Sequence, residues 1–292
     1  MPDAPPATAP GWSAHVVDVG TGEVLLSEDA DAVRRTASVA KVLLLTALAE
    51  AVEAGDVEPD EPLDRSVTPR VADSGLWHRM TTTTLPVDDV ALLVGTVSDN
   101  WATNVLVARL GLARVQAVAT SSGLDDTQLW DLVRDARGPG DVATLSTGTA
   151  RAWAGVMARL HAGTWSGAAV SARVLGWLAG GVDHSMVAGG LARDPLVADA
   201  RLVSKTGTDD GVRADVGLVR GTQRNLAYAV LWNGPEAEAP DVLDRMRALG
   251  ARLRAVVEDA GTEGAGGGTP ARAGVTPQDP DAPRGPGTSK SA

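Results

Sequence analysis

The chain of 292 residues has no cysteine and no phenylalanine, and only one tyrosine. The lack of cysteine excludes disulfide bonds, zinc sites built on thiolates and a cysteine nucleophile. No apolar run is long enough to span a bilayer, and the opening residues lack the basic and apolar regions of a signal peptide. The sequence as written therefore predicts no membrane segment and a cytoplasmic location, or a secreted one if its start is trimmed or misassigned.

The charge balance also argues against some classes of partner. The formal net charge is -11 at pH 7, and lysine and arginine are interspersed with acidic residues, whereas a nucleic acid needs a clustered basic surface. The four histidines show no metal-ligand spacing. We therefore expect no nucleic-acid partner, no metal and no organic cofactor. The length suits one catalytic unit with a cleft, here expected to be a monomer with a small-molecule or peptide-like substrate.

Lysine is scarce, and its positions are informative. There are three lysines, of which Lys41 and Lys205 lie in the body of the chain and Lys290 lies near the C-terminus. Everywhere else the chain uses arginine, which cannot release its proton in a protein, whereas a buried amine can be shifted until it accepts a proton near neutral pH. The two internal lysines are therefore candidates for acid-base chemistry.

Three short motifs follow one another along the chain: Ser38-Val39-Ala40-Lys41, Ser98-Asp99-Asn100 and Lys205-Thr206-Gly207. Each is weak alone, since Ser-x-x-Lys also begins ordinary helices, and Ser, Asp and Asn are common in turns and caps. Placed in this order on a helix, a loop and a strand, they form the signature of class A β-lactamases and penicillin-binding proteins. From about Gly11 to Asp259 the chain resembles the class A β-lactamase family, which Asn104 and the Val19-Gly20-Thr21-Gly22 turn also match.

Hydrophobic patterns predict two strands, a helical middle, three strands and a last helix. Strands are expected at 13–19, 23–26, 201–206, 215–220 and 225–232, and helices at 38–54, 88–96, 101–110, 147–161 and 242–257. This order favours an α+β fold with an antiparallel sheet built from both chain ends. The resemblance specifies a β-lactamase/transpeptidase-like fold with five strands and an inserted helical lobe.

The same patterns divide the chain into a catalytic domain and two tails. The domain is expected at 11–259, with an α/β lobe at 11–35 and 195–259 and a helical lobe at 36–194. The segments 1–10 and 260–292 are rich in Pro, Ala, Gly, Thr or Ser and poor in apolar side chains, so they are predicted to be disordered.

Ser38 and Lys41 are the predicted nucleophile and base. Ser38 is placed at the start of a helix, and Lys41 projects from the same face three residues later. A serine hydroxyl needs a base to become a good nucleophile, and an amine can serve if desolvation and a nearby cation lower its pKa. The resemblance identifies that cation as Lys205. It also implies that the backbone N–H groups of Ser38 and Thr208 form the oxyanion hole.

Further roles are implied by the resemblance alone. Ser98 passes the proton to the leaving nitrogen, and Asn100 holds the substrate amide. Lys205 and Thr206 bind a substrate carboxylate, while Gly207 lets the substrate lie against the strand edge. Two neighbouring residues are interpreted separately: Asp99 caps local amides, and Arg213 is either a further carboxylate contact or a surface arginine.

One part of the family pattern is missing. Class A enzymes carry a glutamate in an Ω-loop that activates the water which releases the acyl-enzyme, but the corresponding segment, 124–135, contains no glutamate. An ungapped alignment places Gln128 at that position, where it would be inert. A deletion of about three residues instead brings Asp131 there, as a shorter carboxylate. Asp131 is the favoured substitute, although a solvated loop aspartate is an equally good interpretation.

Several functions follow from these observations. The first is a serine hydrolase that opens β-lactams, or a related D-alanyl amide, through a Ser38 acyl-enzyme. The second is a D,D-peptidase, esterase or transacylase with slow hydrolysis, which would suit the missing glutamate. The third is not an enzyme: a sensor or binding module that is acylated by a β-lactam and stays acylated.

Overall fold

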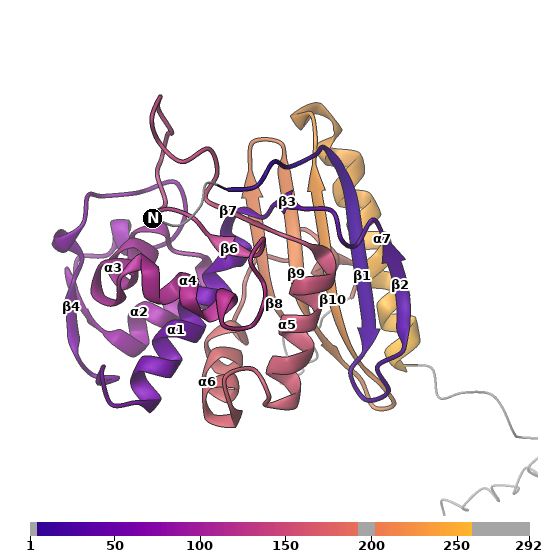
Figure 1. The fold of residues 1–292 in the computed structure, drawn as a ribbon, viewed down its shortest axis with the longest axis horizontal. Helices are drawn as coiled ribbons and strands as arrows, with labels where there is room; N and C mark the ends of the chain where they lie inside the picture. Colours follow the sequence, from indigo (N-terminus) through magenta and orange to yellow (C-terminus); the bar gives the residue numbers. More distant parts are fainter. Residues whose placement is uncertain (1–4, 192–201, 259–292) are drawn as a thin grey trace, which may run out of the picture. The chain divides into compact units, whose positions relative to one another are not determined.

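Five strands drawn from the two ends of the chain form one antiparallel sheet in the order β2-β1-β10-β9-β8 (Figure 1). The computed structural model describes residues 5–191 and 202–258. The strands are β1 (Gly11–Asp18), β2 (Val24–Glu28), β8 (Leu202–Asp209), β9 (Val212–Arg220) and β10 (Asn225–Asn233). The predicted α+β architecture, with a five-stranded antiparallel sheet assembled from both chain ends, is confirmed.

Tight turns join the neighbouring strands where the sequence predicts them. Between β1 and β2, the Asp18 carboxylate accepts hydrogen bonds from the backbone N–H groups of Gly20 (2.8 Å) and Thr21 (3.1 Å). Between β8 and β9, Gly211 has a φ of +63°, a conformation that glycine adopts without steric cost. In this order β8 is an edge strand of the sheet.

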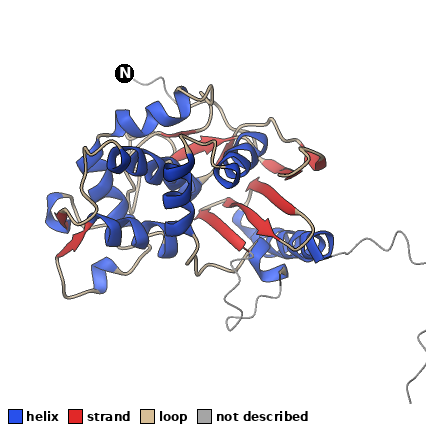
Figure 2. Ribbon diagram, turned by 90° about the horizontal axis from the view of Figure 1, so that it is seen from below, coloured by secondary structure: helices blue, strands red, loops and turns tan. Residues whose placement is uncertain are grey.

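The two faces of the sheet are covered by different helices. One face, with Ala214, Val216 and Leu218, packs against α5 (Ala150–Ala162) and the helical lobe. The other face packs against α7 (Ala239–Glu258) and the short helix η4 (Val187–Gly190). Figures 1 and 2 show α5 and α7 on opposite sides of the strands. Strand alternation explains the division, because successive side chains point to opposite faces.

The helical lobe surrounds α1 (Lys41–Glu53), which is buried nearly all round as its apolar sequence predicts. Its neighbours are α2 (Val87–Val97), α3 (Asn100–Leu110), α4 (Leu112–Thr120) and α6 (Ala168–Leu178). Helices α4 and α6 are not among the predicted elements. The smaller elements are β3 (Arg34–Arg35), β4 (Pro62–Asp64), β5 (Thr84–Pro86), β6 (Gln128–Leu129), β7 (Ser146–Gly148), η1 (Ala37–Ala40), η2 (Arg65–Val67), η3 (Trp77–Arg79) and η5 (Glu236–Glu238). None of the helices within the described ranges has the length and apolar character needed to cross a membrane.

Two predicted helix starts are wrong by one turn. The helix expected from Ser38 begins as the 3-10 turn η1, and its α-helical part starts at Lys41. The helix expected from Thr147 starts at Ala150, because residues 146–148 pair with β3 and β6 as strand β7. Thr149 caps the helix, accepting a hydrogen bond from the Ala152 N–H. At Thr147, strand pairing overrides the helical pattern.

The ends of the predicted domain are only partly described. The segment expected to be a disordered N-terminal tail is held at its end, since the Ala9 and Pro10 carbonyls accept hydrogen bonds from the buried Arg34 guanidinium at 2.6 and 2.8 Å. Arg201, the predicted start of a strand, lies outside the described residues, as does the predicted C-terminal tail at 260–292. The lobe boundaries stay a prediction.

Candidate active site

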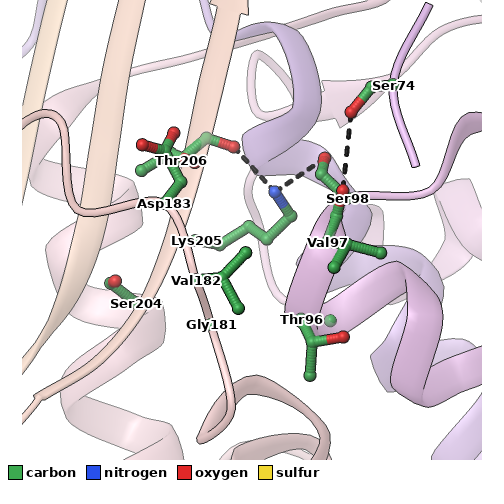
Figure 3. A pocket seen from close by; sticks show the side chains of 11 residues that line it. Ser74, Thr96, Val97, Ser98, Gly181, Val182, Asp183, Ser204, Lys205 and Thr206 are labelled. Carbon is green, nitrogen blue, oxygen red and sulfur yellow. Dashed lines mark hydrogen bonds between the residues drawn. The ribbon is translucent and has the colours of Figure 1, made fainter. Parts of the chain in front are cut away.

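Most of the predicted site residues line one of two adjoining pockets. The first, of about 350 Å³, is lined by Ala37, Ser38, Asp73, Ser74, Ser98, Asn100, Val133, Arg134, Arg137, Leu145, Asp183, Thr206, Thr208 and Asp209. The second, of about 270 Å³, shares Ser74, Ser98, Asp183 and Thr206 with it and adds Lys205 (Figure 3). The structure therefore brings together the three sequence motifs. Lys41, Gly207, Gln128 and Asp131 line neither pocket.

Ser38 is presented by an unusual turn. Ala37, just before it, has a φ of +46°, which is uncommon for a residue with a side chain. Ser146 of β7 supports this turn by donating a hydrogen bond to the Ala37 carbonyl at 2.7 Å. The turn leaves Ser38 half-buried, three residues before the start of α1. Ser146 is a positioning residue that the sequence analysis missed, because a single serine outside the three motifs does not indicate such a role.

Lys41 is fully buried and hydrogen-bonded to the second motif. Its Nζ donates to the Ser98 carbonyl (2.7 Å), the Ser98 Oγ (3.2 Å) and the Asn100 Oδ1 (2.7 Å). Desolvation, reinforced by the charge of Lys205, lowers the pKa of Lys41 well below its usual value, although Asp99 and Asp73 act against this. Within the described residues its hydrogen bonds go to Ser98 and Asn100, so direct pairing with Ser38 stays a prediction.

Ser98 lies between the two lysines. Its backbone is left-handed, with a φ of +56°, at the end of α2. This turn directs its Oγ to 3.2 Å from the Lys41 Nζ and 2.9 Å from the Lys205 Nζ. Asp99 fixes the turn by accepting hydrogen bonds from the N–H groups of Leu76, Trp77 and Ala102, which confirms the prediction that it caps local amides. A hydroxyl between two amines is well placed to pass a proton.

Lys205 occupies the other side of Ser98. Its Nζ also donates to the Thr206 carbonyl at 2.8 Å, and the side chain is buried. Burial lowers the pKa of Lys205 from 10.5 to about 8, although the charges of Asp183 and Asp215 act in the opposite direction. The ammonium is therefore the main form at neutral pH, while its charge is lost at moderately alkaline pH.

Gly207 brings the edge strand against the nucleophile turn. A Cβ placed on it would lie 2.2 Å from the Thr36 carbonyl oxygen and about 3 Å from the Ser38 nitrogen. Only glycine allows β8 and η1 to approach so closely. This packing role differs from the predicted one, in which the glycine makes room for substrate, and that role stays a prediction.

Asp131 is held away from the cleft by two arginines. Its carboxylate accepts hydrogen bonds from Arg134 Nε at 2.8 Å and Arg137 Nη1 at 2.7 Å. Burial favours the neutral acid, but these hydrogen bonds dominate and lower the pKa of Asp131 below its usual value. A carboxylate so stabilised is a weak base, so its role as the water-activating group stays a prediction without geometric support. Gln128 lies in β6, and its side-chain amide donates to Thr120.

The loop between β6 and β7, residues 130–145, is fastened by Asn104. The Asn104 side chain donates to the Val133 carbonyl at 2.8 Å and accepts from the Val133 N–H at 2.9 Å. This two-point contact fixes Val133, a largely buried residue that also lines the first pocket. Val133 is a second site residue that the sequence analysis missed, because it carries no chemical group that marks it.

Two acidic residues near Lys205 also escaped the sequence analysis. Asp183 lines both pockets. Asp215 is fully buried in β9, beside β8, where it accepts hydrogen bonds from the Tyr228 hydroxyl (2.9 Å) and the Val187 N–H (3.0 Å). Asp215 could have been recognised from the sequence, because an aspartate in an otherwise apolar strand indicates a buried carboxyl group with a specific role. In the described parts of the chain, no group of three or more acidic or histidine side chains is arranged to hold a metal ion.

Comparisons with known proteins agree with this geometry. A family model described as the β-lactamase enzyme family matches residues 7–257, whereas no curated protein sequence matches the chain. The fold is similar to that of a β-lactamase from Sphaerobacter thermophilus, with a TM-score of 0.73 and 24% identity over 84% of this chain and 90% of that one.

A second similarity is to PBP-A, with a TM-score of 0.71 and 23% identity over 84% of this chain and 89% of that one. A mutant of PBP-A, solved as an acyl-enzyme complex with penicillin G, gives the same values. These similarities show the predicted β-lactamase/transpeptidase-like fold. With the family match across nearly all of the described residues, they establish that the chain belongs to the β-lactamase enzyme family.

Proposed function

We propose that the protein is a serine acyl-transfer enzyme that opens β-lactams, or a related peptide-like amide, through an acyl-enzyme on Ser38. One observation carries this proposal: the Ser98 hydroxyl lies within hydrogen-bonding distance of two buried lysines, in a cleft that Ser38 also lines. Buried amines with lowered pKa beside a serine are the requirements of nucleophilic serine catalysis.

The acylation step follows from these positions. Ser38 Oγ attacks the substrate carbonyl carbon and its proton passes to the neutral Lys41 amine, while the N–H groups of Ser38 and Thr208 stabilise the oxyanion. When the tetrahedral intermediate collapses, the carbon–nitrogen bond breaks. The Ser98 hydroxyl then gives its proton to the leaving nitrogen and recovers one from Lys41. Lys41 ends the step neutral, and the acyl group is esterified to Ser38.

Asn100 is suited to orient the acyl side of the substrate. Its Oδ1 accepts from Lys41, and its Nδ2 has no hydrogen-bond partner within the described residues. The amide nitrogen is a donor only, so it can bind a substrate carbonyl oxygen. Lys41 thus fixes which end of the Asn100 side chain faces the cleft.

Release of the acyl group is proposed to be slow. The loop at 130–145 contributes Val133, Arg134, Arg137 and Leu145 to the first pocket, but no carboxylate. Without a base at this wall, water attacks the ester slowly. This observation also supports the second candidate, a D,D-peptidase, esterase or transacylase in which an acceptor other than water takes the acyl group.

The test is intact-protein mass spectrometry with time after addition of penicillin G, together with product absorbance from a chromogenic cephalosporin. The full chain, Ser38→Ala and the exposed control Ser27→Ala are compared. A persistent adduct on the parent and on Ser27→Ala, but not on Ser38→Ala, is expected. Rapid multiple turnover would contradict slow release, and an adduct that survives in Ser38→Ala would contradict the nucleophile assignment.

A further inference from the structure

The second pocket lies on the leaving-group side of the site. It is lined by the end of α2, by residues 181–183 and by β8, and Figure 3 shows Lys205 and Ser98 facing each other across it. Ser98, the proposed proton donor to the leaving nitrogen, belongs to both pockets, whereas Ser38 belongs only to the first. A substrate with its carbonyl at Ser38 therefore extends its leaving group toward this 270 Å³ space.

Asp183 places a negative charge where a leaving-group carboxylate would bind. Its carboxylate accepts hydrogen bonds from the Ser185 N–H (3.0 Å) and hydroxyl (2.7 Å). Burial acts to raise the pKa of Asp183, but the Ser185 contacts, a hydrogen bond from the Thr206 side chain and the charge of Lys205 lower it overall. Asp183 is therefore ionised at neutral pH, beside both residues predicted to bind a substrate carboxylate.

The positive charge available at this end is already compensated. Among the described residues that line the second pocket, Lys205 is the one cationic side chain, and the charge of Asp183 stabilises its ammonium. Arg213, the other predicted carboxylate contact, is paired with Glu236 and lines neither pocket. In the second pocket a substrate carboxylate would meet Asp183 without a further cation from the described lining residues to offset the repulsion, since Arg134 and Arg137 line only the first pocket and are paired with Asp131.

Hydrogen bonding at Thr206 leads to the same conclusion. A threonine hydroxyl has one proton to donate, and the Thr206 side chain helps to lower the pKa of the neighbouring Asp183 carboxyl, which is an acceptor for that proton. The acceptor positions of Thr206 and Asp183 remain, and they suit a donor such as an amide N–H. A carboxylate has no donor to offer, whereas a carboxamide has one.

We propose that Asp183 makes the enzyme select acyl donors that carry a carboxamide, instead of a carboxylate, beside the scissile bond, and that the continuation of this amide occupies the second pocket. The substrate class is then an amide within a longer chain and not a terminal amino acid. This inference rests on the proposed function, and the bond broken is still the acyl carbon–nitrogen bond.

The charge test uses penicillin G, its methyl ester and its N-methylamide. The second-order rate constant for acylation of Ser38 is measured by intact mass on the full chain, Asp183→Asn and Asp60→Asn. Asp60 is exposed and lines neither pocket. Asp60→Asn therefore serves as a control that makes the same change in net charge as Asp183→Asn, but outside the site. For the parent, we expect acylation to be fastest with the N-methylamide, slower with the methyl ester and slowest with penicillin G. The rate constants for the amide and for penicillin G should differ about tenfold, as one like-charge contact predicts.

Asp183→Asn should raise the rate with penicillin G about tenfold and lower the rate with the amide, whereas Asp60→Asn should preserve the parent order. Asp183→Glu, which keeps the charge, should also preserve it. A parent that prefers penicillin G over its amide would overturn the proposal, and this comparison needs no variant. Equal changes with all three compounds in Asp183→Asn would overturn it as well.

A length test examines the second pocket. Val182 lines it and is 63% exposed, while Val67, which is 64% exposed, lines neither pocket. Val182→Trp should slow acylation by an N-hexylamide about tenfold and spare the N-methylamide, because the indole fills the space that the longer chain needs. Val67→Trp should affect neither compound. Equal slowing of both amides by Val182→Trp would overturn occupancy of the pocket.

Failure of the proposed function would be separable from failure of this inference. If none of the compounds acylates Ser38, the acyl-enzyme is disproved, and selection is then judged from binding to Ser38→Ala by NMR titration. Tighter binding of the N-methylamide than of penicillin G supports the selection by Asp183, and the reverse order overturns it.

Discussion

Lys205 changes its charge within the range of an ordinary assay, since burial lowers its pKa to about 8. Loss of the ammonium removes the positive charge that faces Ser98 and keeps the pKa of Lys41 low. We therefore expect acylation by the N-methylamide of penicillin G to fall as pH rises through about 8. In Lys205→Arg the guanidinium stays protonated, so the fall should disappear below pH 10 even if the plateau rate is lower.

This prediction is checked by the pH dependence of the acylation rate between pH 6 and 10. The matched control is Arg213→Lys, which exchanges the same two residue types outside both pockets. An unchanged alkaline limb in Lys205→Arg would show that another group controls the rate.

Val133 offers a second test at the residue scale. The Asn104 side chain holds its backbone, and Val133 is one of the residues that line the first pocket with Ser38, so we expect a longer side chain at this position to bring a carboxylate to the acyl-enzyme. We expect Val133→Glu to increase the rate of adduct loss by roughly 10²-fold or more, the usual contribution of a general base. Val133→Gln introduces a side chain of the same shape as glutamate but without a base, so release of the acyl group should stay slow. Equal rates for the two variants, followed by mass spectrometry after removal of free penicillin G, would contradict this.

At the element scale, the contact between β8 and η1 determines the site. A methyl group on Gly207 would overlap the Thr36 carbonyl oxygen and force the strand away from the nucleophile turn. Gly207→Ala should therefore reduce acylation by more than about 10²-fold, because small misplacements of reacting groups have effects of that size. It should also lower the free energy of unfolding by about 1–3 kcal/mol.

Gly176→Ala is the control for Gly207→Ala. This glycine lies inside α6, and nothing lies within 4 Å of an added Cβ. Its replacement should raise the free energy of unfolding by about 0.5–1 kcal/mol and leave acylation unchanged. Urea unfolding and acylation rates on both variants check the pair. A fully active Gly207→Ala would show that β8 can shift without disturbing Ser38.

The same elements show which parts of the fold and the site can be predicted from the sequence. The assembly of the sheet from both chain ends, the buried α1 and the amphipathic α7 follow from periodicity, whereas the strand order is implied by the family resemblance. The three motifs identify the residues around Ser98. The strained Ala37 turn and the Asn104 contact with Val133 join segments far apart in sequence, so local patterns could not reveal them. Asp131 shows the reverse problem. Its carboxylate fits the chemistry in sequence, but Arg134 and Arg137 bind it in the fold.

At the scale of the whole molecule, the sheet connects the site on one side with the packing of α7 and η4 on the other. Asp215 lies at this junction, since it pairs with Thr206 in the β8–β9 register and also holds the Val187 N–H of η4. The segment that carries Asp183 leads directly into η4. Asp215 therefore links the leaving-group wall of the cleft to the outer layer of the fold.

Asp215 should also make the stability of the molecule depend on pH. Burial raises the pKa of its carboxyl from 3.8 to about 7, so at intermediate pH the unfolded chain is ionised while the folded chain keeps the proton. Its contribution to stability is fully present below about pH 4 and is lost as pH rises through about 7. The full difference corresponds to roughly 4 kcal/mol as an upper limit.

Asp215→Asn cannot ionise, so the free energy of unfolding of the parent minus that of the variant should fall by about 2–4 kcal/mol between pH 4 and 8. Urea unfolding of the parent, Asp215→Asn and the exposed control Asp60→Asn measures this difference. A difference that stays constant with pH would mean that Asp215 is already ionised in the folded protein.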